Sequence, residues 1–130
     1  MQIRMMAAGA AAMLAASTAH AQDQGAAGHW RVDGKVSSFA FGLNCTFAQA
    51  GERLTGECVD ASTSDPTIKG GRRHPLTAGS VMADKVGFTY GSSFLLTKFD
   101  VVFNGVRAGD RMSGGIDVQG RKGTFTAVRN

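Results

Sequence analysis

The sequence feature that most constrains the fold is a period-two alternation of apolar and polar residues, which recurs in short runs separated by glycine-containing turns. This alternation is typical of β-strands with one buried face, whereas helical periodicity is absent after residue 21. The runs predict strands that follow one another in an antiparallel meander. We expect eight of them, at residues 30–36, 39–49, 53–59, 75–82, 85–90, 99–106, 111–118 and 124–129.

A seven-residue segment is repeated within the chain. Residues 50–56 have the sequence Ala-Gly-Glu-Arg-Leu-Thr-Gly, and residues 108–114 have Ala-Gly-Asp-Arg-Met-Ser-Gly, so every change is conservative. Each copy fits a hairpin turn, and the two turns are four strands apart. Two equivalent halves of four strands can close on themselves and leave no exposed sheet edge. The sequence therefore predicts an all-β protein, an eight-stranded antiparallel up-and-down β-barrel.

The repeat also predicts strand register. A turn centred on the Gly-Glu pair of the first copy sets Cys45 directly opposite Cys58, close enough for a disulfide. The equivalent positions 58 residues later hold Phe103 and Ile116, so an apolar pair replaces the disulfide in the second half. Both pairs are expected to point into the barrel. The other expected interior residues are Leu43, Phe47, Leu54, Phe88, Tyr90, Val101, Met112, Val118 and Phe125.

Several strand glycines are expected to face an aromatic residue across a hairpin. Glycine permits the strong curvature of a small barrel, and a facing ring covers the backbone that it exposes. The expected pairs are Phe47 with Gly56, Phe88 with Gly79, and Phe39 with Gly34. A turn at Arg121 and Lys122 would also set Val118 opposite Phe125 in the last hairpin.

The start of the chain has the composition of a secretory signal peptide. A basic residue precedes an alanine-rich segment that ends in Ala-His-Ala, a small-residue cleavage pattern. We expect a signal peptide at 1–21, a flexible arm at 22–29 and the barrel domain at 30–130, with no membrane span after cleavage. The protein is therefore predicted to be periplasmic or secreted. In such an oxidising compartment a lone cysteine pair favours a disulfide over a metal or redox site.

Composition and charge argue against several classes of function. Removal of the signal peptide takes one of the 14 basic residues and none of the 10 acidic ones, which leaves a net charge of +3, weak for a nucleic-acid partner. The remaining histidines, His29 and His74, lie in no catalytic motif, and both cysteines are expected to be oxidised. We therefore expect no enzymatic activity, no cofactor and no metal site.

The connection at residues 60–74 is the exception to short turns, because at about 15 residues it is long for a compact β protein. Its second half concentrates Lys69, Arg72, Arg73 and His74 beside a flexible glycine pair, and such side chains can grip a phosphate or sulfate. We name these four as candidate ligand-binding residues; the alternative is a solvated loop. The acidic first half lacks the glycine and the closing glutamate of a calcium-binding loop.

The two ends of the predicted barrel resemble a known family. Gly28-His29-Trp30 opens the first strand, and Val128-Arg129 ends the last. In an eight-stranded meander this resembles the calycin superfamily, which includes lipocalins and avidins, and in which a terminal arginine can stack on the tryptophan. The resemblance implies that Trp30 and Arg129 close one end of the barrel. A barrel of this size is either filled or holds one small molecule, and the apolar interior expected here favours the filled form.

Two classes of function remain. The first is a binding module, in which the barrel mouth or the 60–74 connection contacts a small apolar or anionic ligand of the cell envelope, such as a glycolipid. The second is a protein interaction module. Secreted bacterial metalloprotease inhibitors also resemble small disulfide-bearing eight-stranded barrels, and they insert an extended N-terminal segment into the enzyme. Residues 22–28 have a similar position in this chain.

Overall fold

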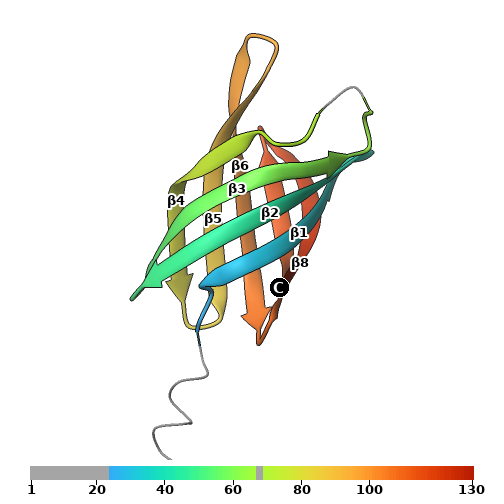
Figure 1. Ribbon diagram of the computed structural model, residues 1–130. Coiled ribbons are helices and arrows are strands. Elements are labelled where there is room, and N and C mark those ends of the chain that lie inside the picture. Colours follow the sequence, from blue (N-terminus) through green and yellow to red (C-terminus); the bar gives the residue numbers. More distant parts are fainter. Residues whose placement is uncertain (1–23, 67–68) are drawn as a thin grey trace, which may run out of the picture.

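The computed structural model describes residues 24–66 and 69–130, so the expected signal peptide at 1–21 lies outside the described residues. Eight strands follow one another in sequence order, and the first pairs with the last to close an antiparallel barrel (Figure 1), which confirms the all-β prediction. The strands are β1 (Gly28–Val36), β2 (Phe39–Ala50), β3 (Arg53–Thr63), β4 (Arg73–Met82), β5 (Lys85–Phe94), β6 (Thr97–Ala108), β7 (Arg111–Val118) and β8 (Arg121–Arg129). The described residues include no helix long and apolar enough to cross a membrane.

The register predicted from the repeat is confirmed. Cys45 lies opposite Cys58 in the β2–β3 ladder, and a disulfide joins them. Phe103 lies opposite Ile116 in the β6–β7 ladder, the equivalent place in the second half. Both turns begin with the glycine of the repeat, at φ angles of 63° and 62°, a conformation that favours glycine at the first position of a hairpin turn.

The β3–β4 connection is shorter than the sequence predicts. β3 continues to Thr63 because it pairs with β2 as far as Phe41, and β4 begins at Arg73, opposite Val59. Beyond that pair the Asp60 amide donates to the Arg72 carbonyl at 2.9 Å. The connection is thereby reduced to residues 64–72. Asp60 therefore lies in β3, and Arg73 and His74 lie in β4, rather than in a long loop. Arg72 directly precedes β4.

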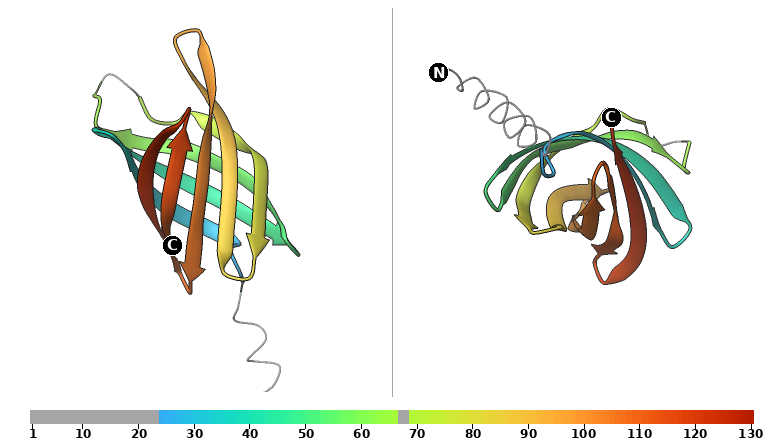
Figure 2. Two further views of the ribbon diagram at one scale, coloured as in Figure 1. Left: turned by 180° about the vertical axis from the view of Figure 1, so that it is seen from behind. Right: turned by 90° about the horizontal axis from the view of Figure 1, so that it is seen from below.

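The β5–β6 hairpin is longer than predicted and projects from one end of the barrel (Figure 1, Figure 2). β5 pairs with β4 only as far as Tyr90, and β6 pairs with β7 only from Val101. Beyond these residues the two strands pair with each other alone, up to Phe94 and Thr97. Residues 91–100 therefore form a two-stranded extension of the barrel, which we call the hairpin extension.

The last hairpin turns two residues earlier than expected. Its turn residues are Gln119 and Gly120, whose φ angles are both positive (54° and 85°), as a tight hairpin turn with two central residues in the left-handed region requires. Phe125 consequently lies opposite Gly114 and not opposite Val118. The expected turn at the following basic pair is therefore wrong.

Aromatic rings cover strand glycines, with one change of partner. Two of the expected pairs are found, Phe47 with Gly56 and Phe88 with Gly79. The third is wrong, because Gly34 lies opposite Phe41 and not Phe39. A Cβ at Gly34 would lie 2.6 Å from the tip of the Phe41 ring, so this glycine makes room for the ring that packs over it.

Aromatic side chains fill the middle of the barrel. Phe103 is fully buried and stacks on Phe88 with ring centroids 4.5 Å apart, while Phe125 meets it edge-on at 5.3 Å. Most of the other expected interior residues are buried as well: Leu43, Cys45, Phe47, Leu54, Cys58, Tyr90, Val101, Met112 and Ile116. Val118 packs against them but is only partly buried. The strand alternation therefore predicted which side chains face inward.

The described part of the expected flexible arm packs against the barrel. Ala26 is fully buried, and its amide donates to the side-chain oxygen of Gln49 at 2.8 Å. The carbonyl of Ala26 accepts a hydrogen bond from the indole N–H of Trp30 at 3.0 Å. These contacts hold residues 24–29 against the barrel, and the first two residues of the arm expected at 22–29 lie outside the described residues.

Candidate binding site

The two ends of the barrel have different structures. The described N-terminal residues and the C-terminus lie at one end, with the β2–β3, β4–β5 and β6–β7 turns (Figure 2). The β1–β2, β3–β4, β5–β6 and β7–β8 connections lie at the opposite end. We call the first the closed end, because side chains cover it, and the second the open end, because it holds a pocket.

Trp30 and Arg129 meet at the closed end. The guanidinium carbon of Arg129 lies 4.6 Å from the centroid of the Trp30 ring, within the range of a cation–π contact. The Nε of Arg129 donates to the Asp110 carboxylate at 2.8 Å, and its other nitrogens donate to the carbonyls of Ala27 and Gly109. Since the indole beneath is fully buried, these contacts cover the barrel at this end.

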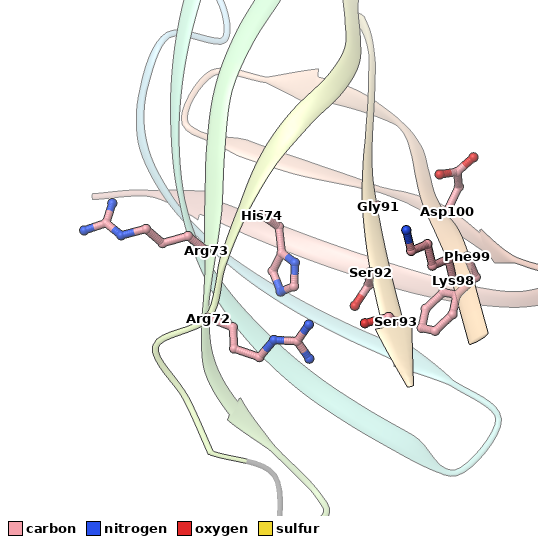
Figure 3. A pocket seen from close by; sticks show the side chains of 9 residues that line it. All are labelled: Arg72, Arg73, His74, Gly91, Ser92, Ser93, Lys98, Phe99 and Asp100. Atoms are coloured by element: carbon pink, nitrogen blue, oxygen red, sulfur yellow. The ribbon is translucent and has the colours of Figure 1, made fainter. Parts of the chain in front are cut away.

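The open end holds a cavity of about 480 Å³ (Figure 3). Three neighbouring strands supply its walls, because β4 and β6 both pair with β5. The residues that line it come from the start of β4, the end of β5 and the start of β6: Arg72, Arg73, His74, Gly91, Ser92, Ser93, Lys98, Phe99 and Asp100. The lining thus combines cationic side chains, hydroxyl groups, one aromatic ring and one carboxylate.

His74 is the buried residue of this lining, with 4% of its surface exposed. Its Nε2 lies 3.0 Å from a carboxylate oxygen of Asp60, and its ring stacks on Tyr90 with centroids 4.5 Å apart. Burial raises the pKa of Tyr90, and the charge of Asp60 raises it further, so the phenol stays neutral. The three side chains form a rigid polar layer between the cavity and the apolar core.

The two adjacent arginines have opposite orientations. Arg73 points away from the cavity in Figure 3, and its guanidinium binds the Glu57 carboxylate at 2.7 Å on the outside of the barrel. Arg72 extends toward the cavity, where Lys98 from β6 also lies (Figure 3). Alternation along the strand explains the difference, because successive side chains of a β-strand point to opposite faces.

The structure brings together only part of the predicted ligand-binding set. Arg72 and His74 line the cavity with their side chains, Arg73 turns its charge outward, and Lys69 is exposed and does not contribute to the lining. The sequence prediction missed the residues from β5 and β6, because it ended β5 at Tyr90. The period-two pattern that continues through Tyr90, Ser92 and Phe94 was the available signal.

The part of the chain that the structure describes has no group of three or more His, Cys, Asp or Glu side chains that could hold a metal ion. Comparison with known protein families, with characterised proteins and with solved structures finds no match. The closed eight-stranded barrel is compatible with the calycin resemblance at the level of the fold. The case for a function therefore depends on the side chains of the open end.

Proposed function

We propose that the open end of the barrel binds a small anionic ligand, one that carries a phosphate, sulfate or carboxylate on an apolar group. The observation that carries this proposal is the position of two cations in one cavity. Arg72 reaches it from the β4 side, and Lys98 lines its edge from β6, on the strand face opposite to Phe99. Within the described residues neither forms a salt bridge, whereas the neighbouring Arg73 does.

An anion in this pocket would accept charge-assisted hydrogen bonds from these cations. The planar guanidinium of Arg72 suits two oxygens of a phosphate or carboxylate, and the hydroxyls of Ser92 and Ser93 offer further donors. Asp100 is the single carboxylate of the lining, so the cavity keeps a net positive charge.

The apolar part of the ligand has a partner in Phe99, which lies in the same lining. Deeper entry is blocked by the layer of His74 and Tyr90 and by the aromatic core beneath it. The pocket of about 480 Å³ is open to solvent, so a ligand there would keep part of its surface exposed. The ligand that fits is therefore small and stays at the barrel mouth.

The protein interaction alternative depended on an extended N-terminal arm. Residues 24–29 give it no support, because the burial of Ala26 and its two hydrogen bonds hold this segment against the barrel. An inhibitor that inserted these residues into an enzyme would first have to break those contacts.

Isothermal titration calorimetry with phenyl phosphate, inorganic phosphate and benzyl alcohol tests the proposal. Wild type should bind phenyl phosphate most tightly, and the double variant Arg72→Gln, Lys98→Gln should lose at least about tenfold in affinity, since a hydrogen bond to a charged group contributes roughly 1.5–3 kcal/mol. The matched control is Arg111→Gln, Lys85→Gln, which removes two exposed cations at the closed end.

The apolar contact has a separate test. Phe99→Ala should weaken phenyl phosphate binding and leave inorganic phosphate binding unchanged. Equal affinity of wild type and the Arg72, Lys98 double variant for phenyl phosphate would overturn the proposal, as would the absence of binding of every probe to wild type.

A further inference from the structure

The tip of the hairpin extension exposes three consecutive large apolar side chains. Phe94 is 62% exposed, Leu95 is 85% exposed and Leu96 is fully exposed. Continuous apolar surface of this kind on a soluble domain marks a contact with another molecule or a membrane. None of the three lines the cavity at the open end, so the proposed anion site does not explain them.

The hairpin extension has no neighbouring strand to stabilise it. Among the described residues its two strands pair only with each other beyond Tyr90 and Val101. An isolated two-stranded hairpin is marginally stable in water. The extension carries the tip beyond the other turns of the open end (Figure 1, Figure 2). The tip can therefore contact a bilayer or another molecule without a clash from the barrel.

The turn at the tip has an unfavourable sequence for a hairpin. Leu95 occupies the first turn position with a φ of 57°, a conformation that bulky residues rarely adopt. The same position of three other hairpins holds a small or polar residue with a similar φ: Ser37, Ala83 and Gln119. A leucine at this position stabilises neither the turn nor the exposed surface. A contact of its side chain with another molecule would explain its presence.

Basic side chains outnumber acidic ones at the open end, although two of them are paired, Arg73 with Glu57 and Lys122 with Asp117. The strand ends and connections of the open end carry Lys35, Lys69, Arg72, Arg73, Lys98, Arg121 and Lys122. The acidic side chains of the same regions are fewer: Asp60, Asp65, Asp100 and Asp117. An apolar tip next to basic side chains is complementary to a bilayer with anionic headgroups. The apolar side chains can insert among the acyl chains, and the cations are attracted to the headgroups.

We propose that the tip of the hairpin extension, residues 94–96, inserts into the interfacial layer of a lipid bilayer that carries anionic headgroups. Insertion would bury the leucine side chains and set the open end against the headgroups. The tip residues lie outside the cavity, but Arg72 and Lys98 belong both to the anion site and to the basic surface, so the test changes the tip alone.

Co-sedimentation with sucrose-loaded vesicles tests the insertion. Wild type should sediment with vesicles of equal parts phosphatidylglycerol and phosphatidylethanolamine, and it should bind phosphatidylcholine vesicles much more weakly. Leu95→Ser, Leu96→Ser should lower partition into the anionic vesicles by at least about tenfold, since these side chains would return to water. The matched control is Met82→Ser, Val106→Ser, which removes two exposed apolar side chains near the closed end and should leave partition unchanged.

Tryptophan fluorescence gives a direct reading of insertion, because the single native tryptophan is Trp30 and it is fully buried. The emission of Leu96→Trp should shift to the blue when anionic vesicles are added, and that of Met82→Trp should not. Both serine variants should retain the wild-type unfolding midpoint and phenyl phosphate affinity, which separates loss of insertion from loss of the fold or of the anion site.

Failure of wild type to bind anionic vesicles would overturn the proposal, as would equal binding by the tip variant. Equal binding to phosphatidylcholine would show that the cations have no part in it. If wild type self-associates through the tip and the tip variant does not, while neither binds vesicles, the tip contacts a second copy and the lipid assignment is wrong.

Discussion

Truncation of Phe103 to alanine removes the ring at the centre of the aromatic core. Phe103 is fully buried, and its ring centroid lies 4.5 Å from that of Phe88 and 5.3 Å from that of Phe125. Loss of the ring therefore leaves a cavity that the closed barrel cannot fill by rearranging. Burial and cavity effects together cost about 3–5 kcal/mol for Phe→Ala. In a domain of this size that corresponds to a fall of roughly 15–30 °C in the thermal unfolding midpoint.

Thermal and urea unfolding of oxidised protein, followed by near-ultraviolet circular dichroism, measures this effect. Phe103→Leu retains most of the buried volume and should lose only about 1–2 kcal/mol, which keeps the comparison possible if the alanine variant fails to fold. Lys85→Ala is the surface control, because Lys85 is exposed. If Phe103→Ala lowers the midpoint no more than Lys85→Ala does, the register and the filled interior are both wrong.

Three further predictions concern the disulfide, the closed end and the buried phenol. Replacement of Cys45 and Cys58 by alanine should lower the free energy of unfolding by about 3 kcal/mol, since the bridge closes a short loop, and an unchanged urea midpoint would contradict this. Arg129→Ala should lower stability by roughly 1–2 kcal/mol and increase acrylamide quenching of Trp30; quenching equal to wild type would show that the guanidinium does not cover the indole. Because the folded state raises the pKa of Tyr90, the unfolded chain loses the phenol proton first, and stability should fall as pH rises above about 10, the pKa of an unperturbed tyrosine. Tyr90 is the single tyrosine, so tyrosinate absorbance should appear only with unfolding. The stability of the Tyr90→Phe variant should fall less steeply with pH than that of wild type. Ionisation of Tyr90 in the folded protein would refute the assignment.

Most of the fold could be predicted from the sequence because it depends on local patterns. Period-two alternation located all eight strands, and the repeated turn segment fixed two hairpin registers, including the opposed pair Cys45 and Cys58. The predicted turn of the last hairpin at Arg121 and Lys122 is wrong, because the chain turns at Gln119 and Gly120. Gly120 was the better signal, since it readily adopts the positive φ that this turn requires.

The cavity could be predicted only in part because its walls come from separate hairpins. The cationic segment before β4 pointed to Arg72 and His74, but nothing local places Lys98 in the same cavity; that follows from the pairing of both strands with β5. The contact between His74 and Asp60 depends on the extra length of β3, which its pairing with β2 produces. The hairpin extension escaped prediction because Leu95 and its apolar neighbours are not turn formers.

The most direct test of the anion site is a titration of isotope-labelled protein with phenyl phosphate, followed by amide and side-chain NMR shifts. The proposed site predicts saturable shifts in three segments, residues 72–74, 91–93 and 98–100, which the fold brings together around one cavity. The indole N–H of Trp30 at the closed end should stay unmoved, because its partner is the Ala26 carbonyl. Saturable shifts centred on the closed end, or no saturable shift in the three segments, would contradict the assignment of the open end as the binding site.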